Sequence, residues 1–203
     1  MAGGIGIFGG TFNPIHLGHL RGAEEVREAL ALDEVRFVPA AAPPHRRGVA
    51  LAAATDRHRM VELAVADVPG FRSWDVELQR PGPSYSVDTV RALRAEVGPA
   101  VRIAFVIGFD AFREFETWKE HATLFTLCDV VVMTRPPWPQ RLGAEEIPLA
   151  AREAFRYDSS SEVFLHESGH VLSLQRITRF LVSGTVERYI AEHRLYRQED
   201  AAR

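Results

Sequence analysis

The residues best suited to chemistry lie at positions 8–20, which read FGGTFNPIHLGHL. The stretch combines two glycines, a threonine and an Asn–Pro pair with His16 and His19, three residues apart. An apolar run precedes it and a helical pattern follows, which predicts a strand, a glycine turn and a helix start. Backbone N–H groups and the positive helix end would then point at one spot and could bind an anion. Both imidazoles could reach that anion, because residues three apart share a helix face.

Three other interpretations fit this stretch less well. Gly4, Gly6 and Gly9 match G-x-G-x-x-G, but residues 5–8 are themselves the expected strand, whereas the dinucleotide motif follows a strand. Two histidines can also bind a metal, yet no Cys, Asp or Glu lies close by in sequence to complete a zinc site. Two polar residues on an exposed helix start would not require GGTFNP before them.

Length and composition predict a soluble globular protein. The 203 residues, 46% hydrophobic and 25% charged, suffice for one domain over 1–203, with a C-terminal subregion from about 168. A net charge of −3 gives no bulk attraction to nucleic acid. No apolar run approaches the roughly 18 residues of a membrane span, so neither nucleic acid nor membrane is an expected partner.

The single cysteine and the N-terminus both favour the cytoplasm. The sequence enters the first expected strand at once, so we expect no signal peptide. Cys128 excludes an intrachain disulfide and suits a reducing compartment. Its apolar neighbours predict a core position rather than a nucleophile.

The elements that would hold the motif alternate between strands and helices. The expected strands are 5–8, 35–39, 73–78, 101–107, 130–134, 163–166 and 171–174. The expected helices are 20–32, 55–66 capped by Thr55, 86–97 capped by Ser86 with Gly98 beyond its end, a stretch from 108 to about 127, and 186–193. This alternation predicts an α/β fold with a parallel sheet.

In such a sheet, ligands bind beyond the carboxyl ends of the strands. The histidine motif, residues 39–47, residues 108–110 and Arg135 each follow an expected strand. We therefore expect these segments to share one rim of the sheet.

The stretch FGGTFNPIHLGHL resembles the signature of the nucleotidyltransferase superfamily that carries a T/H-x-G-H motif. The resemblance implies a Rossmann-like, doubly wound parallel sheet with a small C-terminal helical portion. It also implies attack on the α-phosphate of a nucleoside triphosphate. By itself it leaves the acceptor open among nicotinate or nicotinamide mononucleotide, phosphopantetheine and glycerol phosphate.

Further segments are similar to those of bacterial nicotinate mononucleotide adenylyltransferases. They are APPHRR at 42–47, PSYSVDT at 83–89, VIGFD at 106–110, the Thr117–Trp118 pair, the Arg135–Pro136 pair and the ending YIAEHRLYR. Taken singly, the PPH segment could be a rigid turn, Trp118 a core residue and Asp110 a helix cap. Their joint order along the expected rim favours the functional interpretation.

This resemblance implies transfer of AMP from ATP to nicotinate mononucleotide, which gives deamido-NAD and pyrophosphate in NAD biosynthesis. ATP and nicotinate mononucleotide would be the partners, and Mg²⁺ would accompany ATP. The implied catalytic residues are His16 and His19. The implied ATP-binding residues are Gly9, Gly10, Thr11, Phe12, Gly108, Asp110, Arg135 and Arg179. His45 and Arg46, near the phosphates, would bind the acceptor together with Tyr85, Thr89 and Trp118.

Alternatives remain at this point. The amidated mononucleotide, both mononucleotides, or another phosphate acceptor could be used, although Trp118 and the SYSVDT segment argue against phosphopantetheine. Residues 173–179 read SLQRITR where the family carries ISSTxIR, so Arg179 fills the arginine position but the Ser–Thr pair is absent. This departure motivates a non-catalytic, nucleotide-binding relative as an alternative. The sequence leaves the oligomeric state open, a homo-oligomer included.

Overall fold

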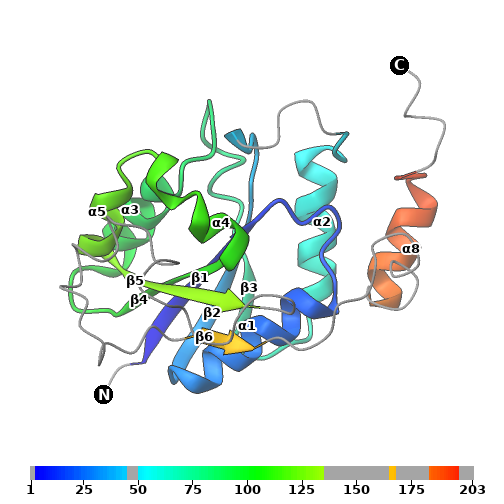
Figure 1. The fold of residues 1–203 in the computed structure, drawn as a ribbon. Helices are drawn as coiled ribbons and strands as arrows, with labels where there is room; N and C mark the ends of the chain where they lie inside the picture. The colour runs from blue at the N-terminus through cyan, green and yellow to red at the C-terminus, as the bar shows by residue number, and fades with distance from the viewer. Residues whose placement is uncertain (1–2, 45–49, 135–164, 168–182, 197–203) are drawn as a thin grey trace.

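A computed structural model describes residues 3–44, 50–134, 165–167 and 183–196 (Figure 1). Its elements are β1 Gly4–Gly10, α1 Leu17–Ala29, β2 Leu32–Pro39, α2 Ala54–Val65, β3 Phe71–Ser73, α3 Ser86–Val97, β4 Ile103–Gly108, α4 Phe109–Arg113, η2 Phe115–Thr117, α5 His121–Leu127, β5 Asp129–Thr134, β6 Leu165–Glu167 and α8 Gly184–Glu192. The expected strand at 171–174 lies outside these residues.

The described strands form one parallel sheet in the order β3-β2-β1-β4-β5-β6. From β1 the chain winds outward to β2 and β3, and it then returns to β4 beside β1 and winds the other way. Within the β1–β4 pair, Ile7 lies opposite Phe105 and Phe8 opposite Val106. The strand order therefore reverses between β1 and β4, the place where such sheets bind ligands. The predicted doubly wound, Rossmann-like fold is confirmed.

Helices cover both faces of the sheet, as Figure 1 shows. Neighbouring residues of a strand point to opposite faces, so Phe8 of β1 packs in a cluster with α1, α2 and α8, whereas Ile7 packs with α3, α4 and α5. Both side chains are almost fully buried. The predicted core position of Cys128 is confirmed, because Cys128 is buried in the cluster that contains Ile7. None of the helices in the described ranges has the length and hydropathy needed to cross a membrane.

Two expected boundaries are wrong around the first helix and the third strand. Helix α1 begins at Leu17 and ends at Ala29, so Leu32, expected in the helix, belongs to β2. The expected strand at 73–78 contributes only Ser73, and the next residues form a turn in which the Leu78 N–H donates to the Asp75 carbonyl at 2.8 Å. Trp74 and Val76, two of the apolar residues that produced the alternation, pack partly buried against the cluster that contains Ile7.

The expected helix caps are also wrong at two positions. The N-cap residues of α2 and α3 are Ala53 and Tyr85, and neither makes a side-chain cap hydrogen bond. Thr55 and Ser86 lie inside the first turns instead. The expected helical stretch up to 127 divides into α4, η2 and α5. Gly98 does end α3, with φ at +76°.

Candidate active site

The loop after β1 is held by buried side chains on both sides of its turn. Phe12 has a left-handed backbone, with φ at +46°, although it is not a glycine. Its ring is 2% exposed, and Ile15 is completely buried. These two anchors fix the loop that joins Gly10 to the first residue of α1.

His16 and His19 lie together at the start of α1. His16 is the N-cap residue, and its backbone N–H donates to Nδ1 of His19 at 3.2 Å. The rings stack, with centroids 3.7 Å apart and an interplanar angle of 29°. Because Nδ1 of His19 accepts a hydrogen bond, the proton of the neutral ring is on Nε2. The cap therefore leaves His19 with Nε2–H as its donor.

Neighbouring residues fix the orientation of both rings. Phe12 meets His19 edge to face at 5.1 Å, and Phe8 does so at 6.0 Å. A Cβ on Gly18 would lie 3.1 Å from Nδ1 of His16, which is closer than ordinary van der Waals contact. The absence of a side chain at Gly18 thus leaves space for the His16 ring.

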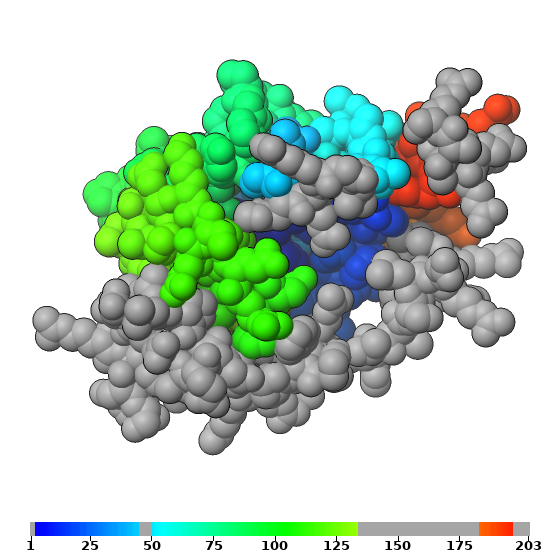
Figure 2. Space-filling model, turned by 45° about the horizontal axis from the view of Figure 1, so that its top comes forward, coloured from blue at the N-terminus to red at the C-terminus, as the bar shows by residue number. Residues whose placement is uncertain are grey.

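The ends of the neighbouring strands complete this rim. The Ala40 N–H, after β2, donates to the Gly10 carbonyl at 2.9 Å. Gly108 ends β4 and caps α4, which places the exposed Asp110 in the first turn of that helix. A Cβ on Gly108 would lie 2.6 Å from Oδ1 of Asp110, so a larger residue there would displace the Asp110 carboxylate. In Figure 2 the blue N-terminal segment lies set back between the green α4 region and the cyan α2.

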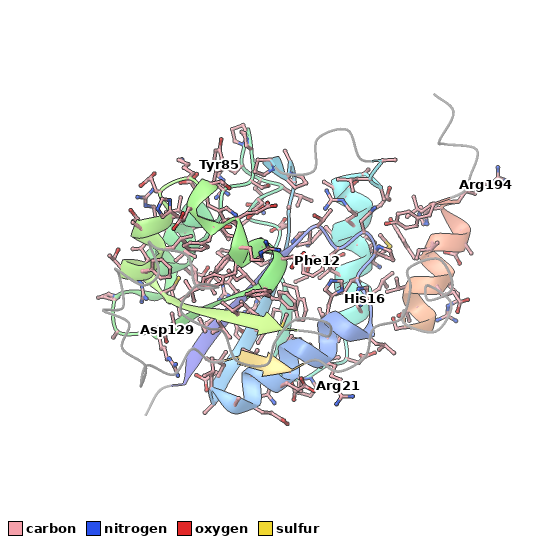
Figure 3. The ribbon with its side chains drawn as sticks, viewed as in Figure 1. Phe12, His16, Arg21, Tyr85, Asp129 and Arg194 are labelled. Atoms are coloured by element: carbon pink, nitrogen blue, oxygen red, sulfur yellow. The ribbon has the colours of Figure 1, made fainter. Side chains whose placement is uncertain are left out.

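Two segments that were grouped from sequence as acceptor-binding are in contact. The Ala42 N–H donates to Oγ of Ser84 at 3.1 Å, and the Ser84 N–H donates to the Ala42 carbonyl at 3.1 Å. Next along, the ammonium of Lys119 lies 4.8 Å from the centre of the Tyr85 ring. Ala42, at the start of the APPHRR segment, and Lys119, next to the TW pair, therefore both contact the PSYSVDT segment. In Figure 3, Tyr85 lies on the side of α3 and α5, and Phe12 and His16 lie nearer α2.

Thr89 and Trp118 differ in how deeply they are buried. Thr89 is 1% exposed, and its hydroxyl donates to Oε1 of Glu77 at 2.6 Å and accepts from Nη2 of Arg80 at 3.2 Å. Trp118 is half-buried and packs on Phe115, with ring centroids 5.3 Å apart. His45, Arg46, Arg135 and Arg179 lie outside the described residues.

Sequence reasoning missed Arg57, the most buried charged residue of the described chain at 2% exposure. Its guanidinium donates to four backbone carbonyl groups around the motif loop, and burial lowers its pKa. A signal was present, because Arg57 shares the inward stripe of α2 with Met60 and Val61, at helical spacing. A charge on an apolar stripe marks a side chain whose partners must come from elsewhere in the fold.

Comparison with known proteins identifies the family. Residues 7–173 match the Cytidylyltransferase-like family. A protein of Syntrophotalea carbinolica, named a probable nicotinate-nucleotide adenylyltransferase, is 40% identical over 215 residues that cover 97% of this chain and 98% of the relative. A protein of Citrifermentans bemidjiense with the same name is 43% identical over 211 residues, covering 95% and 97%.

Solved structures agree at the level of the fold. The Plasmodium falciparum nicotinic acid mononucleotide adenylyltransferase, solved in complex with NaAD, superimposes with a TM-score of 0.69 at 15% identity and covers 96% of this chain and 97% of its own. A second structure of that enzyme, complexed with APC, gives a TM-score of 0.65 at the same identity. Together with the match over most of the sequence, these findings place the chain in the Cytidylyltransferase-like family, among the nicotinate-nucleotide adenylyltransferases.

Proposed function

We propose that this protein transfers AMP from ATP to nicotinate mononucleotide, giving deamido-NAD and pyrophosphate. The observation that carries the proposal is the stacked His16–His19 pair at the N-terminus of α1, beside the point where the strand order reverses. The relatives named nicotinate-nucleotide adenylyltransferases, at 40% and 43% identity over nearly their whole length, support the acceptor.

The transfer needs position and charge more than a strong base. A phosphate oxygen of the acceptor forms the new bond to the α-phosphorus of ATP, and the bond from that phosphorus to the bridging oxygen breaks. The electron pair leaves with pyrophosphate. Because the acceptor phosphate is already ionised at neutral pH, no residue has to remove a proton from it. Catalysis then rests on holding the two phosphates in line and stabilising the developing charge.

His16 and His19 would donate hydrogen bonds to the triphosphate and to the α-phosphate as its charge develops. The donor on His19 is Nε2, because Nδ1 is engaged by the His16 N–H. The loop from Gly9 to Phe12 would bring backbone N–H groups to the phosphates, and the α1 dipole would add positive potential. Asp110 would accept a hydrogen bond from a nucleotide ribose, and Gly108 would let the nucleotide approach β4. We assign Arg135 and Arg179 to the triphosphate.

Magnesium would arrive bound to ATP. Within the described ranges, histidine, cysteine and carboxylate groups do not gather in threes around any point, so that part of the chain offers no protein cage for a metal. Mg²⁺ does not need such a cage, because it keeps several waters and takes phosphate oxygens as ligands. When bound, the ion would neutralise charge on the phosphates.

The acceptor would lie beside the PSYSVDT segment, which contacts Ala42 and Lys119. Trp118 would stack on the pyridine ring, and Tyr85 would line the same pocket. The Thr89 hydroxyl is hydrogen-bonded to Glu77 and Arg80, so Thr89 would shape the pocket by holding the segment around it rather than by contacting the acceptor. His45 and Arg46 would lie near the phosphates.

The test is pyrophosphate release from ATP and Mg²⁺ with nicotinate mononucleotide or nicotinamide mononucleotide at equal concentration. We expect strong preference for the nicotinate form. Equal or greater release with the amide would overturn the choice of acceptor and leave the reaction type standing. No release with either, from folded protein that still binds ATP, would favour a non-catalytic relative.

A further inference from the structure

The buried guanidinium of Arg57 joins three backbone segments that are far apart in sequence. Nη1 donates to the Thr11 carbonyl at 2.6 Å, in the motif loop. Nη2 donates to the Ala40 carbonyl at 2.7 Å and to that of Ala41 at 3.5 Å, in the segment after β2. Nε donates to the Ala52 carbonyl at 3.0 Å, just before α2. One side chain thus fixes the distances between the loop and both of its neighbours.

Asn13 adds a second set of bonds to the same place. Its Oδ1 accepts from the Ala52 N–H at 3.0 Å and from the Tyr196 hydroxyl at 2.8 Å. Both backbone polar groups of Ala52 are therefore taken up, the N–H by Asn13 and the carbonyl by Arg57. The loop cannot move away from α2 without breaking bonds at Thr11 and Asn13 together.

Within the described residues, the hydrogen-bond acceptors around the Arg57 guanidinium are backbone carbonyl groups. No ion pair to Arg57 occurs among the residues that the structure describes, and the neighbouring Asp56 accepts instead from the Tyr189 hydroxyl at 2.8 Å. A buried cation without a carboxylate is costly. Water or a neutral donor could have satisfied these carbonyl groups. A full positive charge behind a loop expected to bind an anion therefore suggests that the charge serves the binding of that anion.

We propose that Arg57 is a positioning residue for nucleotide transfer. Its guanidinium holds the loop at Thr11 in the shape that presents His16 and His19, and it adds positive potential behind the triphosphate. This inference rests on the proposed function, since it assigns the loop to ATP. Arg57 itself is too buried to contact the nucleotide.

The first test removes the side chain and returns it as a small molecule. Arg57→Ala should lower kcat/KM for ATP by about 100-fold, the loss typical of a misplacement near 1 Å. Ethylguanidinium, which matches the deleted atoms, should restore activity by about tenfold or more, whereas neutral ethylurea should restore little. Arg59→Ala is the matched control, because Arg59 lies on the same helix, is exposed and pairs with Glu62 at 2.9 Å. It should keep wild-type activity and ignore ethylguanidinium.

The second variant covers the case in which Arg57→Ala does not fold. Arg57→Lys keeps the charge and the aliphatic stem, but one ammonium has three donors on one atom and cannot span four carbonyls. It should still lower kcat/KM for ATP. Wild-type kcat and KM in the folded Arg57→Lys protein would overturn the proposal, as would an Arg57→Ala protein whose folded fraction has wild-type kinetics.

Hydrogen exchange separates this proposal from the proposed function. Backbone amides at positions 11–19 should exchange faster in Arg57→Lys than in wild type, while those of α3 remain unchanged. Equal exchange at 11–19 would overturn the positioning role even if the enzyme is active. An inactive wild type would overturn the proposed function alone, since the exchange comparison does not depend on turnover.

Discussion

His19 has two separable tasks, because its two ring nitrogens face different partners. Nδ1 accepts from the His16 N–H and so caps the helix, while Nε2 is left as the donor. His19→Asn keeps an acceptor near the position of Nδ1 and removes the atom at Nε2, whereas His19→Ala removes both. We expect kcat to fall by about 10²–10³ in each variant, as when one transition-state donor is removed. Pyrophosphate release measures this loss, and His16→Ala should show a loss of the same order.

Stability distinguishes the two His19 variants. Losing a helix cap costs about 1 kcal/mol, so His19→Ala should unfold at lower urea concentration than His19→Asn. Folded variants of both histidines with near wild-type kcat would show that the site is misassigned.

Gly18 makes a prediction in which stability and activity move in opposite directions. A Cβ there would lie 3.1 Å from Nδ1 of His16, so the ring must shift by a few tenths of an ångström. Gly18 is also exposed in the first turn of α1, where alanine favours a helix by up to about 1 kcal/mol. Gly18→Ala should therefore keep or raise the melting temperature and lower kcat about tenfold. A Gly18→Ala enzyme with unchanged kcat would mean that the position of His16 is not critical.

At the scale of elements, α8 is attached to α2 by a hydrogen bond and a buried side chain. The Tyr189 hydroxyl donates to Oδ1 of Asp56 at 2.8 Å, and Val186 is fully buried. Burial, and then the hydrogen bond to Asp56, raise the pKa of Tyr189 to about 12 from an ordinary 10. The protonated form is therefore favoured in the folded state. The stabilisation of the folded state by the protonated hydroxyl is present below pH 10 and is lost as the pH rises from 10 to 12.

Tyr189→Phe tests this attachment. The variant should be less stable than wild type by about 1 kcal/mol at pH 8, the usual net value of one hydrogen bond. Because phenylalanine does not titrate, the difference in the free energy of unfolding should shrink between pH 10 and pH 12. Urea unfolding across this range measures it. If the difference in the free energy of unfolding stays constant from pH 10 to pH 12, the Tyr189 hydroxyl does not stabilise the fold through Asp56.

Apolar patterns predicted the elements better than their ends. Residues 101–107 and 130–134 are apolar runs, and both coincide with buried strands within two residues. The turn after Ser73 was missed because the pattern records which residues are apolar and not the backbone conformation that carries them. Helix α1 begins three residues before its apolar periodicity, because His16 and His19 cap it and a histidine cap has no common sequence signal.

At the scale of the whole molecule, the sequence indicated the rim but not the bonds that hold it. Motifs at the ends of β1, β2 and β4 can be placed on one edge from topology alone. Arg57 and Thr89 could not be interpreted in this way. The first depends on carbonyl groups 5 to 46 positions away, and the second on Glu77, which pattern analysis placed in a strand.

Cys128 can report whether nucleotide binding stabilises the whole domain. It lies just before β5, at the amino ends of the strands, whereas the proposed site lies at their carboxyl ends. A bound nucleotide therefore cannot shield Cys128 directly. Burial raises its pKa to about 12, and its thiol donates to the Leu124 carbonyl. Alkylation at pH 8 should therefore require opening of the fold and run at least about 100-fold slower than in urea.

MgATP at about 100 times its Kd should slow this alkylation by about a further 100-fold, because a ligand that binds only the folded state lowers the open population by that factor. The Arg57→Lys protein should show a smaller effect at the same ATP concentration. If ATP binds and leaves the alkylation rate unchanged, Cys128 is exposed by local opening between α5 and β5. In that case the ends of the sheet would not unfold as one unit, and the loop at Thr11 would be stabilised independently of the opposite edge.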